Sequence, residues 1–309
     1  MAPRNAEMET ILAKMRAAPG VDYPSLAMPE ARRIFEASAA VWNTDEPSLE
    51  RIELSIPSPG GPMRAGLYLP HGLEKPPLIV YAHGGGWTFG SIESHGATMA
   101  RLALASGAAL LGMDYRLAPE HPFPAPLNDV AAAIDFAEAG GLGARVDATR
   151  LGLAGDSAGA NLALAALLRR RDAGKPSLRA AALFYGCYLP LFTTESHREL
   201  GGGDYLLTTK IMRWYWRNFL GADSEETRSL AAPYHADLTG LPPLYLTAAG
   251  LDPLRDDTLM IADKLARAGI DFRFDHVPGV VHGYLRMANE LAAARRSNEA
   301  AGRFFAELL

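Results

Sequence analysis

The sequence contains almost no cysteine, no excess of positive charge and no long hydrophobic run. Cys187 is the single cysteine in 309 residues, which excludes an internal disulfide framework and favours a reducing compartment, the cytoplasm. We expect it to be a small buried hydrophobe rather than a nucleophile. Lysine and arginine number 30 against 35 aspartates and glutamates, and the net charge of −5 argues against a nucleic-acid partner.

Signals for membranes, metals and nucleotides are missing as well. No window reaches about 18 consecutive apolar residues, so we expect no stable membrane insertion. The first 20 residues mix both charge signs and lack the apolar stretch of a signal peptide. The HExxH zinc motif is absent, His197-Arg198-Glu199 has the wrong spacing, and neither common glycine-rich nucleotide motif occurs. We therefore expect no metal and no cofactor.

What the sequence does contain is an alternation of strand and helix patterns. The alternation predicts an α/β fold, a mostly parallel eight-stranded sheet with helices on both faces. The first two strands are separated by PSPGGP and are expected to form an antiparallel pair. The predicted strands cover 49–56, 63–69, 78–83, 108–113, 151–155, 178–185, 244–249 and 272–277, and the predicted helices 94–106, 126–139, 158–168, 206–220, 254–268 and 287–308.

Two segments stand outside this alternation. Residues 1–45 have the apolar spacing of two short amphipathic helices, too small to form a domain of their own. Between 187 and 232 a polar, glycine-rich part precedes the aromatic helix 206–220, which leaves little room for a polar face. Its aromatic side chains are either ordinary packing or part of an insertion that, with the N-terminal helices, covers a pocket for an apolar group.

The stretch LGLAGDSAGANLALAALL, residues 151–168, carries the strongest chemical signal. An apolar strand, a sharp turn and an apolar helix are the setting of a nucleophile elbow, with Ser157 exposed over the N-terminus of the helix. Gly155 and Gly159 flank it because side chains there would collide with neighbouring backbone. A chance G-x-S-x-G is expected about one time in five to ten at this glycine content, and the flanking elements argue against chance.

A serine nucleophile also needs hydrogen-bond donors for the oxyanion. His83-Gly84-Gly85-Gly86-Trp87 follows a predicted buried strand, and consecutive glycines let backbone N–H groups point at one spot. This matches the HGGG type of oxyanion loop, in which loop amides act together with the amide after the nucleophile, here that of Ala158. The alternative is a loop that cradles phosphate, which the missing nucleotide motifs disfavour.

Three histidines lie well downstream of Ser157 and are candidates for the base. His282 follows the last predicted strand in PGVVHGY and is favoured, because the fold orders the triad as serine, acid, histidine. His276 lies inside a strand pattern, where a lone histidine is more often structural. His235 precedes a strand, which is the wrong place for the base.

The acid is expected just after the 244–249 strand. Asp252, in GLDPLRDD, satisfies this requirement. Asp256 and Asp257 fall in the first turn of the next helix, where carboxylates commonly interact with the helix dipole.

Together these residues make the chain resemble the bacterial hormone-sensitive-lipase-like, GDSAG-type esterases of the α/β-hydrolase fold. The resemblance covers about residues 50–290 and rests on five ordered blocks: HGGGWTFGS, DYRLAPEHPFPAPLND, GDSAGAN, DPLRDD and HGY. It implies a triad of Ser157, Asp252 and His282, with an oxyanion region of Gly84, Gly85, Gly86 and Ala158. It also implies a helical cap, 1–45 with 187–225, on a catalytic core of 46–186 and 226–309.

The resemblance implies further roles as well. His83, Asp156, Arg116 and Glu120 match motif residues that order the loops around the site. Two positions depart from the family pattern: Ala160 replaces a glycine, which is expected to tighten helix packing or narrow the pocket floor, and Gly186-Cys187-Tyr188 replaces a proline-containing turn.

The expected function is hydrolysis of short- to medium-chain acyl esters, with a small-molecule ester as partner and no cofactor. An amidase or acyltransferase would use the same triad, and a non-catalytic small-molecule receptor is the alternative of another class. A homodimer joined at the sheet edge near the last strand is expected from the resemblance alone.

Overall fold

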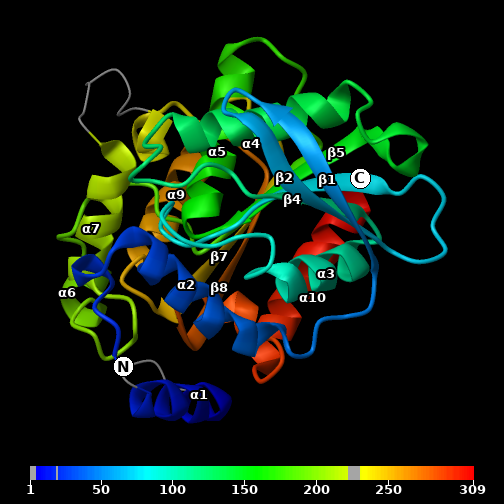
Figure 1. The fold of residues 1–309 in the computed structure, drawn as a ribbon. Coiled ribbons are helices and arrows are strands. Elements are labelled where there is room, and N and C mark those ends of the chain that lie inside the picture. Colours follow the sequence, from blue (N-terminus) through cyan, green and yellow to red (C-terminus); the bar gives the residue numbers. More distant parts are fainter. Residues whose placement is uncertain (1–4, 19, 222–229) are drawn as a thin grey trace.

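An eight-stranded sheet runs through the computed structural model, which describes residues 5–18, 20–221 and 230–309 (Figure 1). The strand order is β1-β2-β4-β3-β5-β6-β7-β8. β1 and β2 form the predicted antiparallel pair, β2 is antiparallel to β4, and the other neighbours are parallel. The bounds are β1 Glu50–Ser58, β2 Gly61–Leu69, β3 Pro77–Ala82, β4 Ala109–Met113, β5 Asp147–Asp156, β6 Ala180–Phe184, β7 Leu244–Leu251 and β8 Phe272–Val281.

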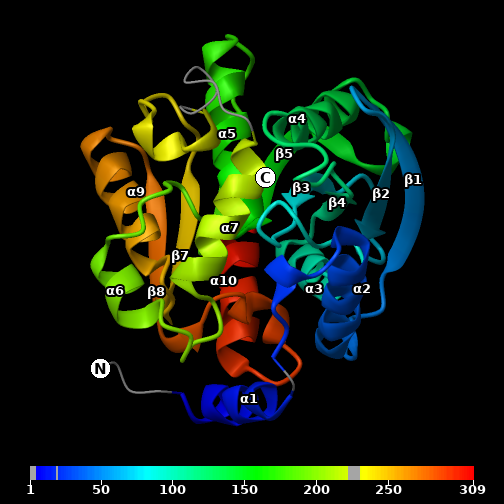
Figure 2. The same ribbon diagram turned by 60° about the vertical axis from the view of Figure 1, so that its left-hand side comes forward.

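Helices cover both faces of this sheet, as predicted. On β3, Leu78 and Val80 belong to one core cluster and Ile79 and Tyr81 to the other, because successive side chains of a strand point to opposite faces. The first face is covered by α4 (Ala125–Glu138), α5 (Ala158–Asp172) and α9 (Arg255–Arg267). The second is covered by α3 (Gly96–Ser106) and α10 (Ala292–Leu308), which lie side by side (Figures 1 and 2).

The burial of each strand follows its place in the sheet. The inner strands β4 and β6 are buried along their whole length, which explains their continuous apolar sequences. The edge strands β1 and β8 alternate between half-buried and exposed residues over much of their length. No helix within the described ranges is long and apolar enough to cross a membrane.

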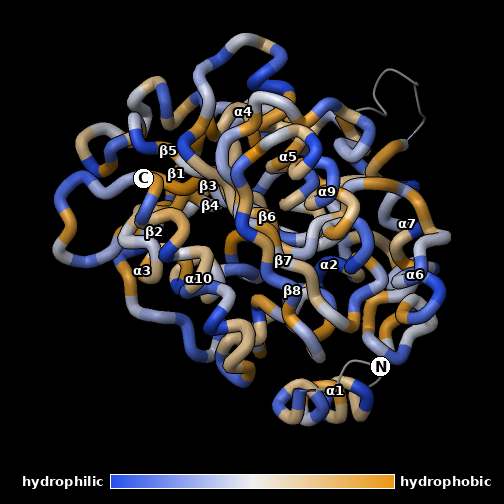
Figure 3. The backbone as a smooth tube through the Cα atoms, turned by 180° about the vertical axis from the view of Figure 1, so that it is seen from behind, coloured by the Kyte–Doolittle hydropathy of each residue, from blue (hydrophilic) through white to orange (hydrophobic). Residues whose placement is uncertain are grey.

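Further helices lie in the described parts of the two segments outside the alternation. They are α1 (Ala6–Ala17), α2 (Met28–Ala39), α6 (Glu195–Leu200) and α7 (Thr209–Leu220). α1 buries Met8, Ile11 and Leu12 and alternates between orange and blue in Figure 3, as expected for an amphipathic helix. The last residues of the expected cap, 222–225, lie outside the described residues.

The structure differs from the predictions at several places. α6 forms inside the polar stretch, where no element is predicted, and the Thr194 side chain caps it by accepting from the His197 N–H. β8 continues past residue 277 to Val281, through an irregularity in its pairing with β7. The last helix, predicted from residue 287, begins only at Ala292, and a short 3-10 turn, η5 (Tyr284–Met287), precedes it.

Candidate active site

Ser157 lies in a strained turn between β5 and α5. Its φ of 53° and ψ of −119° place a non-glycine residue in the left-handed half of backbone space. The two flanking glycines are required, as predicted. A Cβ on Gly155 would lie 2.4 Å from the Gly159 carbonyl oxygen, and a Cβ on Gly159 would lie 1.9 Å from that of Ala82. The turn thus presents Ser157 at the N-terminus of α5, which favours negative charge.

His282 links Ser157 to Asp252 by two hydrogen bonds. Its Nε2 lies 2.8 Å from Ser157 Oγ, and its Nδ1 lies 2.7 Å from Asp252 Oδ2. Asp252 is fully buried directly after β7, and its Oδ1 accepts from the Leu254 N–H at 2.8 Å. The structure therefore brings together the serine, histidine and aspartate that the sequence singled out.

The other candidates lie elsewhere. His276 is exposed on β8, opposite Ala248, and His235 ends the 3-10 turn Pro233–His235. Asp256 and Asp257 are in the first turn of α9, as predicted, and they also hold the segment that follows β6. Asp256 accepts from the Ser196 N–H at 2.8 Å.

Asp257 is a fully buried carboxyl beside the site. Its Oδ2 accepts from the backbone N–H groups of Tyr188, at 2.9 Å, and Leu189, at 3.3 Å. Burial raises the pKa of Asp257 to about 8, although the two backbone hydrogen bonds oppose the shift. The carboxyl is therefore protonated over much of the neutral range.

The glycine loop after β3 lies beside Ser157. Gly85 and Gly86 have φ of 122° and 59°, and both line the cavity next to Ser157. Gly84 differs from the expectation, because its N–H donates to Asp156 Oδ1 at 2.9 Å and is thus occupied. Among the described residues, no hydrogen bond uses the N–H groups of Gly85, Gly86 or Ala158. These three amides are free to bind an oxyanion.

Asp156 anchors that loop from beneath. Besides the Gly84 N–H it accepts from Tyr81 Oη at 2.8 Å and Tyr185 Oη at 3.4 Å, and His95 Nε2 lies 3.6 Å away. Burial would raise the pKa of Asp156, but the His95 ring and these hydrogen bonds hold it well below its usual range. An ionised carboxylate in this position fixes the loop to the turn that carries the serine.

His83 is a buried, neutral residue of the same loop. Its Nδ1–H donates to the Gly84 carbonyl at 2.8 Å, and its ring stacks on Tyr115 with the centroids 4.2 Å apart. Burial lowers the pKa of His83 to about 3. This geometry agrees with the expected ordering role, because a neutral imidazole holds the loop without adding charge.

Arg116 and Glu120 connect other elements to the site. Arg116 forms a two-pronged ion pair with the buried Asp129 of α4, with both N–O distances 2.9 Å. Glu120 forms an ion pair with Arg32 of α2, and Arg32 also donates to the Thr88 carbonyl of the glycine loop. Arg32 therefore ties the N-terminal helices to the oxyanion loop, a contact that the sequence did not indicate.

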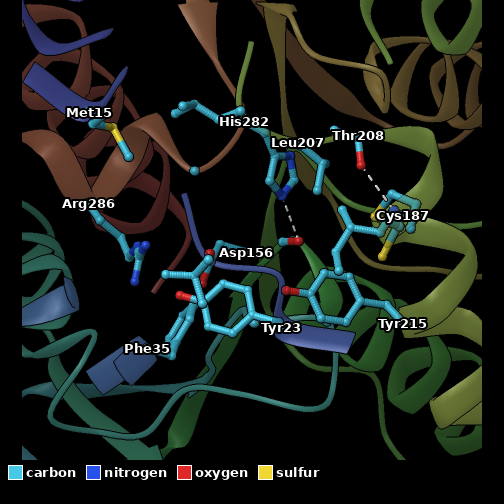
Figure 4. A pocket seen from close by; sticks show the side chains of 18 of the residues that line it. Met15, Tyr23, Phe35, Asp156, Cys187, Leu207, Thr208, Tyr215, His282 and Arg286 are labelled. Carbon is cyan, nitrogen blue, oxygen red and sulfur yellow. Dashed lines mark hydrogen bonds between the residues drawn. The ribbon is translucent and has the colours of Figure 1, made fainter. Parts of the chain in front are cut away.

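A cavity of about 610 Å³ opens above Ser157 and His282. Most of its lining is apolar or aromatic, with Tyr23, Phe35 and Tyr215 prominent in Figure 4. The Tyr215 ring of α7 lies close against the oxyanion loop, since a Cβ on Gly86 would be 2.3 Å from it. Both interpretations of the aromatic helix 206–220 therefore hold in part: Tyr215 lines the cavity, whereas Trp216 and Phe219 are buried in the core.

The two departures from the family pattern lie differently with respect to this cavity. Ala160 is fully buried in the core and does not line the cavity, so the extra methyl group affects helix packing. Cys187 lines the cavity but is 1% exposed, and burial raises its pKa well above the ordinary value. No group of three or more His, Cys, Asp or Glu side chains in the described parts of the chain is arranged to hold a metal ion.

Comparison with known proteins identifies the family. Residues 79–286 match a family model described as alpha/beta hydrolase fold. The carboxylesterase NlhH of Mycobacterium tuberculosis is 36% identical over 242 residues, covering 75% of this chain and 73% of NlhH. This chain is a hormone-sensitive-lipase-like α/β-hydrolase.

Other members of the family are similar over most of the chain. The esterase LipI of the same organism is 34% identical over 255 residues, covering 80% of this chain and 79% of its own. The structure of a hyperthermophilic esterase from the archaeon Pyrobaculum calidifontis superposes with a TM-score of 0.93 at 32% identity, covering 99% of this chain and 98% of that one. The fold and the family predicted from the sequence are thus confirmed.

Proposed function

We propose that this α/β-hydrolase is a serine carboxylesterase in which Ser157, His282 and Asp252 form the catalytic triad. The observation that carries the proposal is the continuous hydrogen-bonded series from Asp252 through His282 to Ser157 at the base of an apolar cavity. The names of the relatives support the bond type, since NlhH and LipI are a carboxylesterase and an esterase.

Acylation begins with attack by Ser157 Oγ on the ester carbonyl carbon. His282 Nε2 accepts the serine proton and then gives it to the departing alcohol, leaving an acyl group on the serine. Asp252 accepts a hydrogen bond from Nδ1–H, which fixes the ring and stabilises its charged form. Water, activated by the same histidine, then releases the acid and restores the serine.

The oxyanion is stabilised by the free amides of Gly85, Gly86 and Ala158. Ala158 is the first residue of α5, so the positive end of the helix dipole adds to its N–H. Gly84 holds the loop instead, through Asp156, and His83 assists by its bond to the Gly84 carbonyl. Asp156 and His83 are thus positioning residues.

The substrates proposed are esters of short to medium acyl chains. We assign residues 1–45 and 187–225 to a cap over the core of 46–186 and 226–309. The described cap residues Tyr23, Phe35 and Tyr215 line the cavity, and its volume of about 610 Å³ suits a small molecule. An amidase or acyltransferase shares the triad, whereas a receptor would not need its intact hydrogen bonds.

Hydrolysis of p-nitrophenyl acetate, butyrate, octanoate and palmitate near pH 8 tests this proposal, with wild type beside Ser157→Ala. Turnover of the shorter esters that is lost in the variant supports the serine esterase. Comparison of an ester with its matched anilide separates esterase from amidase. Turnover that survives in Ser157→Ala means that the nucleophile is another residue, and no turnover by folded wild type favours the receptor.

A homodimer and a cytoplasmic location complete the proposal. β8 is the last strand of the sheet, and its residues 272–278 are half-buried or exposed, so this part of the edge is available to pair with a second copy. Analytical ultracentrifugation measures the mass in solution, and a monomer at micromolar concentration would contradict the dimer. The single, buried cysteine suits a reducing compartment, which cell fractionation would check.

A further inference from the structure

Arg286 brings a positive charge without a hydrogen-bond partner into the mostly apolar cavity. It lies in η5, four residues after His282, and its side chain reaches into the cavity on the side of Met15 and Phe35 (Figure 4). Among the described lining residues, Lys210 is the one other lysine or arginine, and it is exposed. Arg286 is half-buried, and its Nη1 is shut off from solvent.

None of the N–H groups on this guanidinium donates to a protein group in the described parts of the chain. The Phe35 ring lies beside it, with the ring centroid 5.4 Å from Cζ. A buried donor left without a partner is energetically unfavourable, more so when it is charged, so such groups usually meet a partner in the working state of a protein. A ligand that accepts these hydrogen bonds would offset the unfavourable free energy of the unpaired donors.

The neighbouring carboxylates, Asp156 and Glu36, interact electrostatically with Arg286 but form their hydrogen bonds with other groups. Asp156 accepts from Tyr81 and the Gly84 N–H, as described above. Glu36 accepts from Ser91 Oγ at 3.0 Å. The guanidinium therefore lies at the wall of the substrate cavity with its planar set of donors unused, the geometry that binds a carboxylate by two hydrogen bonds.

We propose that Arg286 binds a carboxylate on the substrate, so that this site prefers esters that carry a negative charge away from the scissile bond. The inference rests on the proposed esterase function and adds the substrate class to it. The carboxylate belongs either to the acyl part, as in a monoester of a dicarboxylic acid, or to the alcohol part. Both sources present the same group to the arginine.

Two pairs of substrates distinguish the sources. Monoethyl adipate carries the charge in its acyl part and diethyl adipate is its neutral partner, while 4-acetoxybenzoate carries it in the alcohol part and methyl 4-acetoxybenzoate is neutral. The measured quantity is the ratio of kcat/KM for the charged ester to that for its neutral partner, for release of ethanol or acetate, respectively. Taking the ratio removes effects that fall equally on both members of a pair.

Arg286→Met should lower this ratio about tenfold or more for the pair whose carboxylate the arginine binds, as expected for the loss of a charge-assisted hydrogen bond. The ratio for Arg286→Lys should lie between those for wild type and Arg286→Met, because lysine keeps the charge but lacks the planar set of donors. Arg33→Met is the matched control: Arg33 is exposed on α2, outside the cavity, and its loss should leave both ratios unchanged.

Ratios that stay the same in the folded Arg286 variants for both pairs would overturn the inference while leaving the esterase intact. An equal fall of the ratio in Arg33→Met would also overturn the inference, because the effect would then come from the net charge of the protein. If Arg286→Met does not fold, the Arg286→Lys ratio decides. Hydrolysis of none of the four esters, nor of p-nitrophenyl butyrate, by folded wild type would overturn the esterase proposal and this inference together.

Discussion

At the scale of single residues, the site depends on where backbone and side-chain donors are already occupied. Ser157 lies in a strained turn that two glycines permit, and its hydroxyl meets a histidine whose other nitrogen is bonded to a buried aspartate. Gly84 uses its N–H to hold the loop, while the N–H groups of the next two glycines are free among the described residues. The three consecutive glycines therefore differ in whether their N–H groups are occupied.

Replacing Asp252 by asparagine tests the acid. The amide keeps the shape of the side chain but presents an NH₂ group to His282, which favours the wrong tautomer, so we expect kcat to fall about a thousandfold or more. Asp271→Asn is the matched control, since this exposed carboxylate just before β8 makes no hydrogen bond through its side chain in the described structure. Near-full activity of folded Asp252→Asn on p-nitrophenyl butyrate would remove Asp252 from the triad.

Asp156→Asn tests the anchoring of the oxyanion loop. The amide cannot accept from Tyr81, Gly84 and Tyr185 together, so the loop should shift and kcat should fall about tenfold to a hundredfold, with a smaller change in KM. Asp135→Asn, which removes a surface carboxylate paired with Lys175, should leave both constants unchanged. An unaltered kcat in folded Asp156→Asn would show that the loop does not need this anchor.

The three residues of the proposed triad could be singled out at this scale because each follows a strand of a recognisable pattern. The hydrogen-bond network around Asp156 could not be predicted from the sequence. His95 and Tyr81 lie 61 and 75 positions from Asp156 in the sequence, and no local pattern marks their meeting. The occupied N–H of Gly84 depends on the same tertiary contact, so three equivalent glycines were expected where two are free.

At the scale of elements, the segment after β6 is fastened to the first turn of α9. Asp257 accepts two backbone N–H groups from it, and Asp256 accepts a third from α6. The strands and most helices were predicted closely because their apolar periods are regular. α6 was not, because its buried residues include Ser196 and His197, which make its sequence resemble a loop.

The buried Asp257 predicts a pH dependence of stability. Its pKa is about 8 in the folded state and near 3.8 in the unfolded state, so between these values the folded protein holds a proton that the unfolded chain has lost. The contribution of Asp257 to the free energy of unfolding therefore falls as the pH rises from about 4 to about 8.

Asp257→Asn should remove this dependence, since the amide resembles the protonated carboxyl and its oxygen still accepts both N–H groups. Urea unfolding of wild type and variant at several pH values from 4 to 8 measures the difference. We expect the variant to gain stability relative to wild type toward pH 8. Parallel curves for the two proteins would contradict the raised pKa.

At the scale of the whole molecule, the triad spans chain segments that only the sheet brings together. Ser157, Asp252 and His282 follow β5, β7 and β8, parallel strands of one sheet, so their carboxyl ends meet at one edge. The fold class, and the three residues of the proposed triad, could be predicted from the sequence for this reason. The shape of the cavity could not be predicted from the sequence, because it depends on how the N-terminal helices and α7 pack over that edge.

The central claim, that Ser157 carries the acyl group during turnover, can be measured directly by trapping the intermediate. Protein mixed with p-nitrophenyl butyrate is quenched in acid within milliseconds, digested and analysed by mass spectrometry. The account predicts that one butyryl group is found on the peptide that contains Ser157 and is missing from Ser157→Ala. Butyryl on another side chain, or turnover with no acylated peptide at any quench time, would contradict it.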